Sequence, residues 1–415
     1  SIEDLELASD DADDGVTATR LVPDATIVPG LVKIDGYTRV SRYLCDKLDL
    51  AEGRNFRPFP YDWRRDNVRT AQQLESQAMD WLRFCRADSG HKDAKQVLIG
   101  HSMGGLISRW FVECLGGWQH TRALVTLGTP HRGSLNAVGF IENGMKKGIG
   151  PFGLDLSPLL RSFTSVYQLL PIYPCINDGQ GLHSVADAAQ RGLLRQVDVA
   201  RATAARAFHQ KILDAQGRNA QQSAYLDSGY TMLPVVGVEQ PTAQSAHVAG
   251  GRCTMMNTLD GQDLGGDGTV PRVSATPVDM QDASREVYAA ETHGAIQNND
   301  GTLANLMGLL TRDKIDWRKF QRASDQATLS LELDDVLLPG EPLQVRARPS
   351  EGNPRLALTL EPLGGGQTFE ERLMRDSARG EGWQGGEFAL PPGTWRVTVH
   401  GDGVAPVSDL VVAAQ

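Results

Sequence analysis

No stretch of this sequence approaches the ~20 consecutive apolar residues that a membrane-spanning helix requires. Basic residues are also scarce, 41 lysines and arginines against 51 aspartates and glutamates, so the net charge is −10 at pH 7. Negative charge disfavours binding to nucleic acid or to an anionic membrane by charge alone. These absences exclude the class of helical membrane proteins, and they predict no nucleic-acid partner.

Cysteine is nearly absent as well. The five cysteines are scattered, odd in number and without Cys-x-x-Cys spacing. This usage argues against a structural zinc site and against a dense disulfide framework. It favours a cytoplasmic location, with secretion as the alternative.

A Gly-His-Ser-Met-Gly motif at residues 100–104 is the most informative feature present. It follows the apolar run 97–99 directly, and a stretch with helical spacing of apolar residues comes after it. This order is typical of a nucleophile elbow, a turn so tight that the residues two positions from the serine must be small. We interpret Ser102 as an exposed nucleophile, and Gly100 and Gly104 as the small residues.

The motif belongs to an alternating pattern of strands and helices. Strands are expected at 25–28, 55–59, 97–99, 123–127, 232–238 and 285–290, and helices at 37–48, 68–85, 105–112 and 303–310. Repeated units of this kind predict an α/β fold with a mostly parallel sheet covered by helices on both faces.

The regular pattern is interrupted over residues 132–230. This region has no clear strand and contains a proline-punctuated apolar segment at 152–170. An insertion here would lie over the carboxyl ends of the strands, where such folds hold their sites. We expect a cap or lid, with additional helical core as the alternative.

The composition changes again at both ends of the chain. Acidic residues crowd the first fourteen positions, so residues 1–20 are predicted to be a mobile acidic segment. Residues 21–320 are expected to form the catalytic α/β domain. Residues 325–415 contain apolar–polar alternation between proline- and glycine-rich turns, at 329–333, 343–347, 355–360 and 394–399. This alternating pattern predicts a small antiparallel β-sandwich as an accessory domain.

A serine nucleophile needs a base that is itself oriented by an acid, and with this elbow the chain order is serine, acid, histidine. The glycine-rich loop around Asp267 suits the acid, with Asp263 as the alternative. Of the nine histidines, only His293 and His400 follow Asp267. Because His400 lies in the predicted β-sandwich, whereas His293 follows the predicted strand at 285–290, we assign His293 as the base.

Other roles follow from the same chemistry. His101 adjoins the nucleophile, but its side chain should point away from the serine, so it is not assigned as the base. The oxyanion needs two backbone N–H donors, each contributing ~3–4 kcal/mol. We assign them to Met103 and to Leu31, in the loop after the first strand. Since the histidine supplies the general base, no metal and no cofactor are expected.

Four further sequence motifs resemble those of a known protein family. They are Pro-Tyr-Asp-Trp-Arg at 60–64, Leu-Gly-Thr-Pro-His-Arg-Gly-Ser at 127–134, Tyr-Gln-Leu-Leu-Pro at 167–171 and Gly-Asp-Gly-Thr-Val-Pro at 266–271. Together with the elbow, they resemble the lecithin:cholesterol acyltransferase-like branch of the α/β-hydrolases over roughly residues 25 to 315. The resemblance implies an enzyme that cuts or transfers acyl chains on phospholipids and related esters. It places the triad on Ser102, Asp267 and His293, with Leu31 and Met103 as the oxyanion donors.

The resemblance also implies that Trp63 shapes an acyl pocket. Two features depart from it. No cysteine pair matches the short lid disulfide of the secreted animal members, which weakens a link to sterol chemistry, and the β-rich tail has no counterpart.

The sequence therefore predicts a serine lipase or phospholipase that acts through an acyl-enzyme on Ser102, with acyl transfer as a further activity. The expected partners are a lipid ester substrate, a membrane surface touched transiently through the cap, and a protein bound by the C-terminal β-domain. The alternatives are a soluble carboxylesterase or thioesterase, and a non-catalytic scaffold acting through the β-sandwich.

Overall fold

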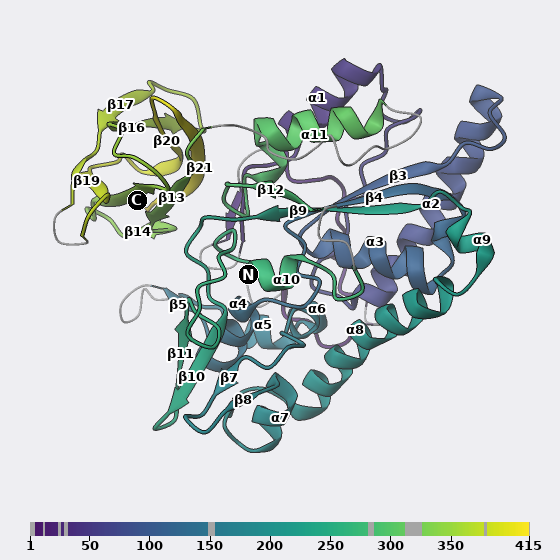
Figure 1. The fold of residues 1–415 in the computed structure, drawn as a ribbon, viewed down its shortest axis with the longest axis horizontal. Coiled ribbons are helices and arrows are strands. Elements are labelled where there is room, and N and C mark those ends of the chain that lie inside the picture. The colour runs from purple at the N-terminus through teal and green to yellow at the C-terminus, as the bar shows by residue number, and fades with distance from the viewer. Residues whose placement is uncertain are drawn as a thin grey trace.

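The centre of the computed structural model is a four-stranded parallel sheet (Figure 1). Its strands, in spatial order, are β12 (Val287–Ala289), β9 (Thr231–Gly237), β4 (Thr121–Leu127) and β3 (Gln96–His101). The structure describes residues 5–10, 13–23, 26–28, 32–147, 154–280, 286–311, 326–376 and 380–414. In this described part, no helix combines the length and the apolar character that crossing a bilayer demands.

Helices cover both faces of this sheet because its central strand is apolar on both sides. In β4, Ala123 and Val125 pack under α1 (Thr38–Leu48) and α11 (Asp300–Leu310). The intervening Leu124 packs on the opposite face, in a cluster with three other helices, α2 (Asn67–Ser89), α3 (Met103–Cys114) and α8 (Val199–Asn219). Figure 1 shows α1 and α11 on one side of the sheet and α3 and α8 on the other. The predicted α/β class is confirmed.

The cap lies between β4 and β9 in the chain. Its described elements are α4 (Leu135–Val138), η3 (Gly139–Asn143), β5 (Lys146–Lys147), β6 (Leu154–Asp155), α5 (Ser157–Ser162), α6 (Thr164–Gln168), β7 (Ile176–Asn177), β8 (Leu182–His183) and α7 (Val185–Gln190). A hairpin of β10 (Ser245–Ala249) and β11 (Arg252–Met256) completes a small sheet with β7 and β8. Leu160, Phe163 and Leu170 are buried in a core that is separate from the clusters on the parallel sheet. The segment thus has a core of its own, whereas α8, which lies within the predicted insertion at 132–230, packs on the parallel sheet. That the segment acts as a cap stays a prediction.

Two expected strands differ in the structure. Residues 55–59 form no strand and make only one isolated bridge, between Glu52 and Phe56, because Pro58 and Pro60 remove the N–H groups that a sheet ladder needs. The expected first strand exists as β1 (Thr26–Val28). It pairs antiparallel with β2 (Val32–Ile34), and this hairpin is separate from the parallel sheet.

The described part of the acidic N-terminal segment lies against the protein. Leu7 is buried in the core of the cap, and the Asp14 carboxylate is 2.7 Å from a guanidinium nitrogen of Arg64. Arg65 also contacts Asp14, at 2.9 Å. These contacts are not those of a free tail, because two arginines pair with the Asp14 carboxylate.

The C-terminal part is a sandwich of two sheets, as predicted. One has the order β13 (Leu329–Leu333), β15 (Leu343–Pro349), β19 (Gln384–Phe388), β18 (Met374–Arg375), and the other β14 (Val336–Leu337), β21 (Val404–Ala413), β20 (Gly393–Gly401), β16 (Leu356–Pro362), β17 (Phe369–Arg372). Alternate residues of β15, from Leu343 to Ala347, are buried between the sheets. The predicted boundary near residues 320–325 lies outside the described residues.

Candidate active site

Ser102 occupies the turn between β3 and α3 with φ 52° and ψ −125°. A positive φ is unusual for a residue with a side chain. The backbone strain that it causes is found at functional sites, where the surrounding structure enforces the conformation. Here the Ser102 N–H donates to the carbonyl of Leu127 (2.9 Å), and the Gly105 N–H donates to the carbonyl of Ser102 (3.0 Å). The central strand and the helix therefore hold the elbow from both sides.

Of the two glycines expected to be required in the elbow, the structure supports only Gly100. A Cβ on Gly100 would lie 2.7 Å from the backbone of Gly104, so Gly100 is required. A Cβ on Gly104 would meet only the Tyr61 hydroxyl, at 3.8 Å, which is an ordinary contact. The steric reason given for Gly104 is therefore wrong. Instead Gly105 is crowded, because its Cβ would collide with the buried side chain of Thr129.

This difference gives a stability prediction. We expect Gly105→Ala to lower the free energy of unfolding by about 1–3 kcal/mol, because Thr129 is buried and has no room to move. The matched variant Gly104→Ala should change it by less than about 1 kcal/mol, since alanine favours the helix and has space. Urea unfolding of both variants measures the two values. Equal losses would contradict the steric explanation.

The structure brings the three predicted triad side chains together. The Nε2 of His293 lies 2.9 Å from Ser102 Oγ, and its Nδ1 lies 2.7 Å from Asp267 Oδ2. The other oxygen, Asp267 Oδ1, accepts N–H groups from Thr269 (2.9 Å) and Val270 (2.7 Å). Because the carboxylate is held by its loop, it can accept Nδ1–H and leave Nε2 free to accept the serine proton.

Backbone contacts fix the loops that carry this acid and this base. The N–H of His293 donates to the carbonyl of Asp267 at 2.8 Å. Gly128 lies beneath the pair, and a Cβ there would come within 2.8 Å of Asp267 Oδ2 and 3.1 Å of His293 Nδ1. The acid and the base thus sit directly on the end of the central strand.

His101 does not face the nucleophile, in agreement with its exclusion as the base. Its Nδ1 lies 2.8 Å from the hydroxyl of Tyr37, and its Nε2 lies 2.9 Å from the carbonyl oxygen of His293. Burial lowers the pKa of His101 to about 3, so the ring is neutral. A neutral ring can accept a hydrogen bond from the Tyr37 hydroxyl at Nδ1 and donate one from Nε2–H to the carbonyl of His293. Sequence reasoning missed Tyr37, because nothing in the chain order links residues 37 and 101.

The remaining predicted residues have different outcomes. Asp263 bonds Gln244 (2.6 Å) and the N–H of Gly265 (2.9 Å) rather than a histidine. Met103 is the first residue of α3, where helix N–H groups have no partner within the helix. Leu31 lies outside the described residues, so its role stays a prediction.

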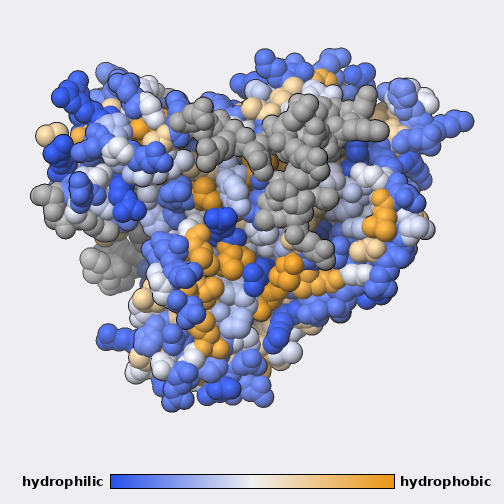
Figure 2. Space-filling model, in the orientation of Figure 1, coloured by the Kyte–Doolittle hydropathy of each residue, from blue (hydrophilic) through white to orange (hydrophobic). Residues whose placement is uncertain are grey.

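A cavity of about 560 Å³ contains Ser102 and His293 in its wall. One side is apolar and comes mainly from the cap, with Trp63, Ala137, Phe140, Val166 and Leu169. The ring of Trp63 meets that of Phe163 edge to face, with centroids 5.2 Å apart. Figure 2 shows hydrophobic residues at the surface over the cap. Within the described ranges, no three histidine, cysteine or acidic side chains form a group that could hold a metal.

Comparison with known proteins supports the resemblance. The lecithin:cholesterol acyltransferase family matches residues 32–217, which include Ser102 and Trp63 but not Asp267 or His293. This match confirms the resemblance predicted from the motifs, for that region. A search of curated proteins found no match.

Two solved structures show a distant similarity. The lipase BlEst2 of Bacillus licheniformis, in its mature form, is 17% identical, with 60% of this chain and 75% of that chain covered and a TM-score of 0.31. The phospholipase PlaB of Legionella pneumophila is 12% identical, with 94% and 89% covered and a TM-score of 0.37. Similarity at this level says nothing about the substrate of this protein.

Proposed function

We propose that this protein is a serine hydrolase that cleaves the acyl esters of lipids through an acyl-enzyme on Ser102. The observation that carries the proposal is the hydrogen-bonded chain Ser102–His293–Asp267 at the wall of a cavity with an apolar side. The match to the lecithin:cholesterol acyltransferase family supports lipid ester hydrolysis or acyl transfer at the level of the family.

The chemistry follows from the geometry. His293 Nε2 takes the proton of Ser102 as the serine oxygen attacks the ester carbonyl carbon. The tetrahedral intermediate collapses when the carbon–oxygen bond to the alcohol breaks and His293 returns the proton to that alcohol. Water then attacks the acyl-enzyme with the same help, and the fatty acid leaves. An alcohol in place of water would complete acyl transfer.

Backbone donors stabilise the negative oxygen of both intermediates in this scheme. The N–H of Met103 opens helix α3 beside Ser102, where the positive end of the helix dipole adds to the effect. Leu31 is proposed as the second donor, from the loop between β1 and β2. Asp267 stabilises the imidazolium form of His293.

In this proposal the acyl chain lies on the cap side of the cavity, because that wall is apolar. Trp63, Phe140, Val166 and Leu169 would contact the chain, and each buried methylene contributes ~0.8 kcal/mol. The hydrophobic residues over the cap in Figure 2 support contact of this face with a lipid surface while substrate enters.

A chain-length series tests the substrate class. With p-nitrophenyl esters from acetate to palmitate, we expect kcat/KM to rise up to about fourfold per added methylene until the cavity is filled. Vesicles of phosphatidylcholine should release fatty acid, detected by mass spectrometry. A preference for short chains, with intact vesicles, would favour the carboxylesterase alternative. Failure of wild-type protein to react with a fluorophosphonate would favour the scaffold.

A further inference from the structure

The C-terminal sandwich is joined to the loop of Asp267 by one buried side chain. Gln240 follows β9, and its side chain bonds the edge strand β13: Nε2 donates to the carbonyl of Leu329 (2.9 Å), and Oε1 accepts the N–H of Leu331 (3.0 Å). The amide thus satisfies the edge of β13 as a neighbouring strand would. The backbone N–H of Gln240 donates to the carbonyl of Gly266, next to Asp267 (2.9 Å).

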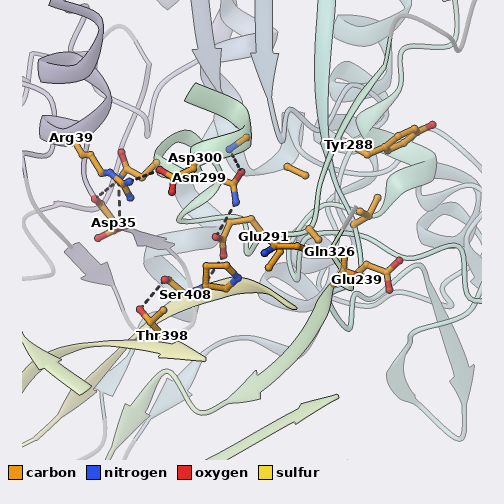
Figure 3. Close-up of a pocket in the computed structure, with 18 of the residues that line it drawn as sticks. Asp35, Arg39, Glu239, Tyr288, Glu291, Asn299, Asp300, Gln326, Thr398 and Ser408 are labelled. Atoms are coloured by element: carbon orange, nitrogen blue, oxygen red, sulfur yellow. Dashed lines mark hydrogen bonds and ion pairs between the residues drawn. The ribbon is translucent and has the colours of Figure 1, made fainter. Parts of the chain in front are cut away.

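A second strand of the sandwich is held in the same way beside His293. The hydroxyl of Thr292 donates to the carbonyl of Ser408 in β21 (2.7 Å), and the N–H of Ser408 donates to Glu291 Oε1 (3.0 Å). Among the described strands, β21 has no neighbour on that side at this point, since β14 pairs with it only at Val412 and Ala413. Figure 3 shows Glu291 pointing toward Ser408, with Thr398 bonded to Ser408 on the sandwich side.

A third contact reaches the residue that follows His293. The guanidinium Nε of Arg396, in β20, donates to Asp35 Oδ1 (3.1 Å). The backbone N–H of Asp35 in turn donates to the carbonyl of Gly294 (2.8 Å). Thr292 is therefore bonded directly to the sandwich, and Gly294 is linked to it through Asp35.

The side chains that make the first two contacts from the loop side are buried. Gln240 is 3% exposed, Glu291 4% and Thr292 7%. Burial raises the pKa of Glu291 to about 8. Because a buried polar group that loses its partner is strongly disfavoured, the sandwich and the two loops hold each other in one arrangement. The open groove of about 1,680 Å³ in Figure 3 is lined by Asp35, Glu291 and Ser408 from these contacts, but neither Ser102 nor His293 lines it.

The sandwich also reaches the catalytic cavity itself. Its residues in the cavity wall are Leu331, Glu332, Leu333, Asp335 and Asp409. They come from β13, from the turn after it, and from β21, the same strands that Gln240, Glu291 and Thr292 hold. One structural unit therefore both lines part of the cavity and contacts the loops of the acid and the base.

We propose that the C-terminal β-sandwich is an integral part of the active site, in which Gln240 and Thr292 act as positioning residues for Asp267 and His293. The proposal rests on the function proposed above. It differs from the expectation of an accessory domain, because the sandwich would then set the rate of the chemical step. A small shift of a catalytic group, of the order of 1 Å, lowers rates about 100-fold.

Thr292 offers the sharpest test, because Thr292 and Thr398 both bond Ser408 and one can serve as the control for the other. Thr292→Val removes the hydroxyl that reaches the Ser408 carbonyl and keeps the shape of the side chain. We expect kcat with p-nitrophenyl butyrate to fall about 10- to 100-fold, with KM within about twofold. Thr292→Ser keeps the hydroxyl and should restore most of the rate. The control Thr398→Val, which removes the bond to Ser408 Oγ inside the sandwich (2.9 Å), should leave kcat within about twofold.

Hydrogen–deuterium exchange gives a readout that does not depend on activity. Thr292→Val should speed amide exchange in residues 262–270 and 290–295, whereas α3 and β4 should exchange as in the wild type. If the wild-type protein hydrolyses no ester, the proposed function fails, and this exchange pattern alone decides the positioning role. Unchanged kcat in an active enzyme would overturn the proposal, as would unchanged exchange in both loops, or an equal loss of rate in Thr398→Val.

Discussion

Replacing Ser102 by alanine is expected to lower kcat for ester hydrolysis by about six orders of magnitude. Without the hydroxyl, His293 has no proton to accept from the nucleophile, and no acyl-enzyme can form. Only binding and the oxyanion donors would remain, and these sustain a small residual rate. Covalent labelling by a fluorophosphonate, followed by mass spectrometry, should locate the label on Ser102 and show its complete loss in the variant.

The control for this prediction is a serine in the helix that follows Ser102. Ser108, in α3, is buried and donates its hydroxyl to the carbonyl of Gly104 at 2.8 Å. Ser108→Ala should retain labelling and activity within about threefold, since only a local helix hydrogen bond is lost. Labelling that persists in Ser102→Ala would show that another residue is the nucleophile, and the proposed mechanism would then be abandoned.

The second large effect is expected from Asp267→Asn, which should lower kcat about 10,000-fold. The amide oxygen can still accept the N–H groups of Thr269 and Val270, so the loop keeps its shape. The amide nitrogen then faces His293 Nδ1 and donates to it. This reverses the tautomer, and Nε2 carries a hydrogen where it should accept the proton of Ser102.

Asp263→Asn is the matched control for the acid. Asp263 was the alternative acid, but it bonds Gln244 and Gly265 instead of a histidine. We expect its activity to stay within about fivefold of the wild type, and the circular dichroism of both variants to match. If Asp263→Asn abolished activity while Asp267→Asn did not, the assignment of the acid would be wrong.

Much of the site could be predicted because it depends on chain order. The elbow at residues 100–104 has a local sequence pattern, and the order serine, acid, histidine then leaves few candidates for the acid and the base. The structure brings Ser102, Asp267 and His293 into hydrogen-bond contact, while their catalytic roles stay a prediction.

The residues that sequence reasoning missed are linked only by the folded chain. Tyr37 and His101 meet because the residue that precedes α1 lies beside the last residue of β3, and Gln240 meets Leu331 because two separate sheets come together. No spacing in the sequence records such contacts. The crowding at Gly105 was missed for a related reason, since it depends on Thr129 from the loop after β4.

Strand prediction failed where local chemistry outweighs the apolar pattern. Residues 55–59 are rich in apolar side chains, but the prolines at 58 and 60 prevent pairing. In the sandwich, β21 was missed because Pro406 and Asp409 interrupt its alternation. Its neighbour β20 supplies the partner that makes it a strand. The proposed domain limits remain predictions.

The side-chain bonds to β13 and β21 limit how this chain can be shortened. A fragment ending before residue 326 would leave the amide of Gln240 and the carboxyl of Glu291 without the main-chain groups that now meet them. Both loops would then face water at the point where the reaction takes place. An engineer who wants a minimal catalyst from this scaffold therefore has to keep the last ninety or so residues, or redesign the surface they cover.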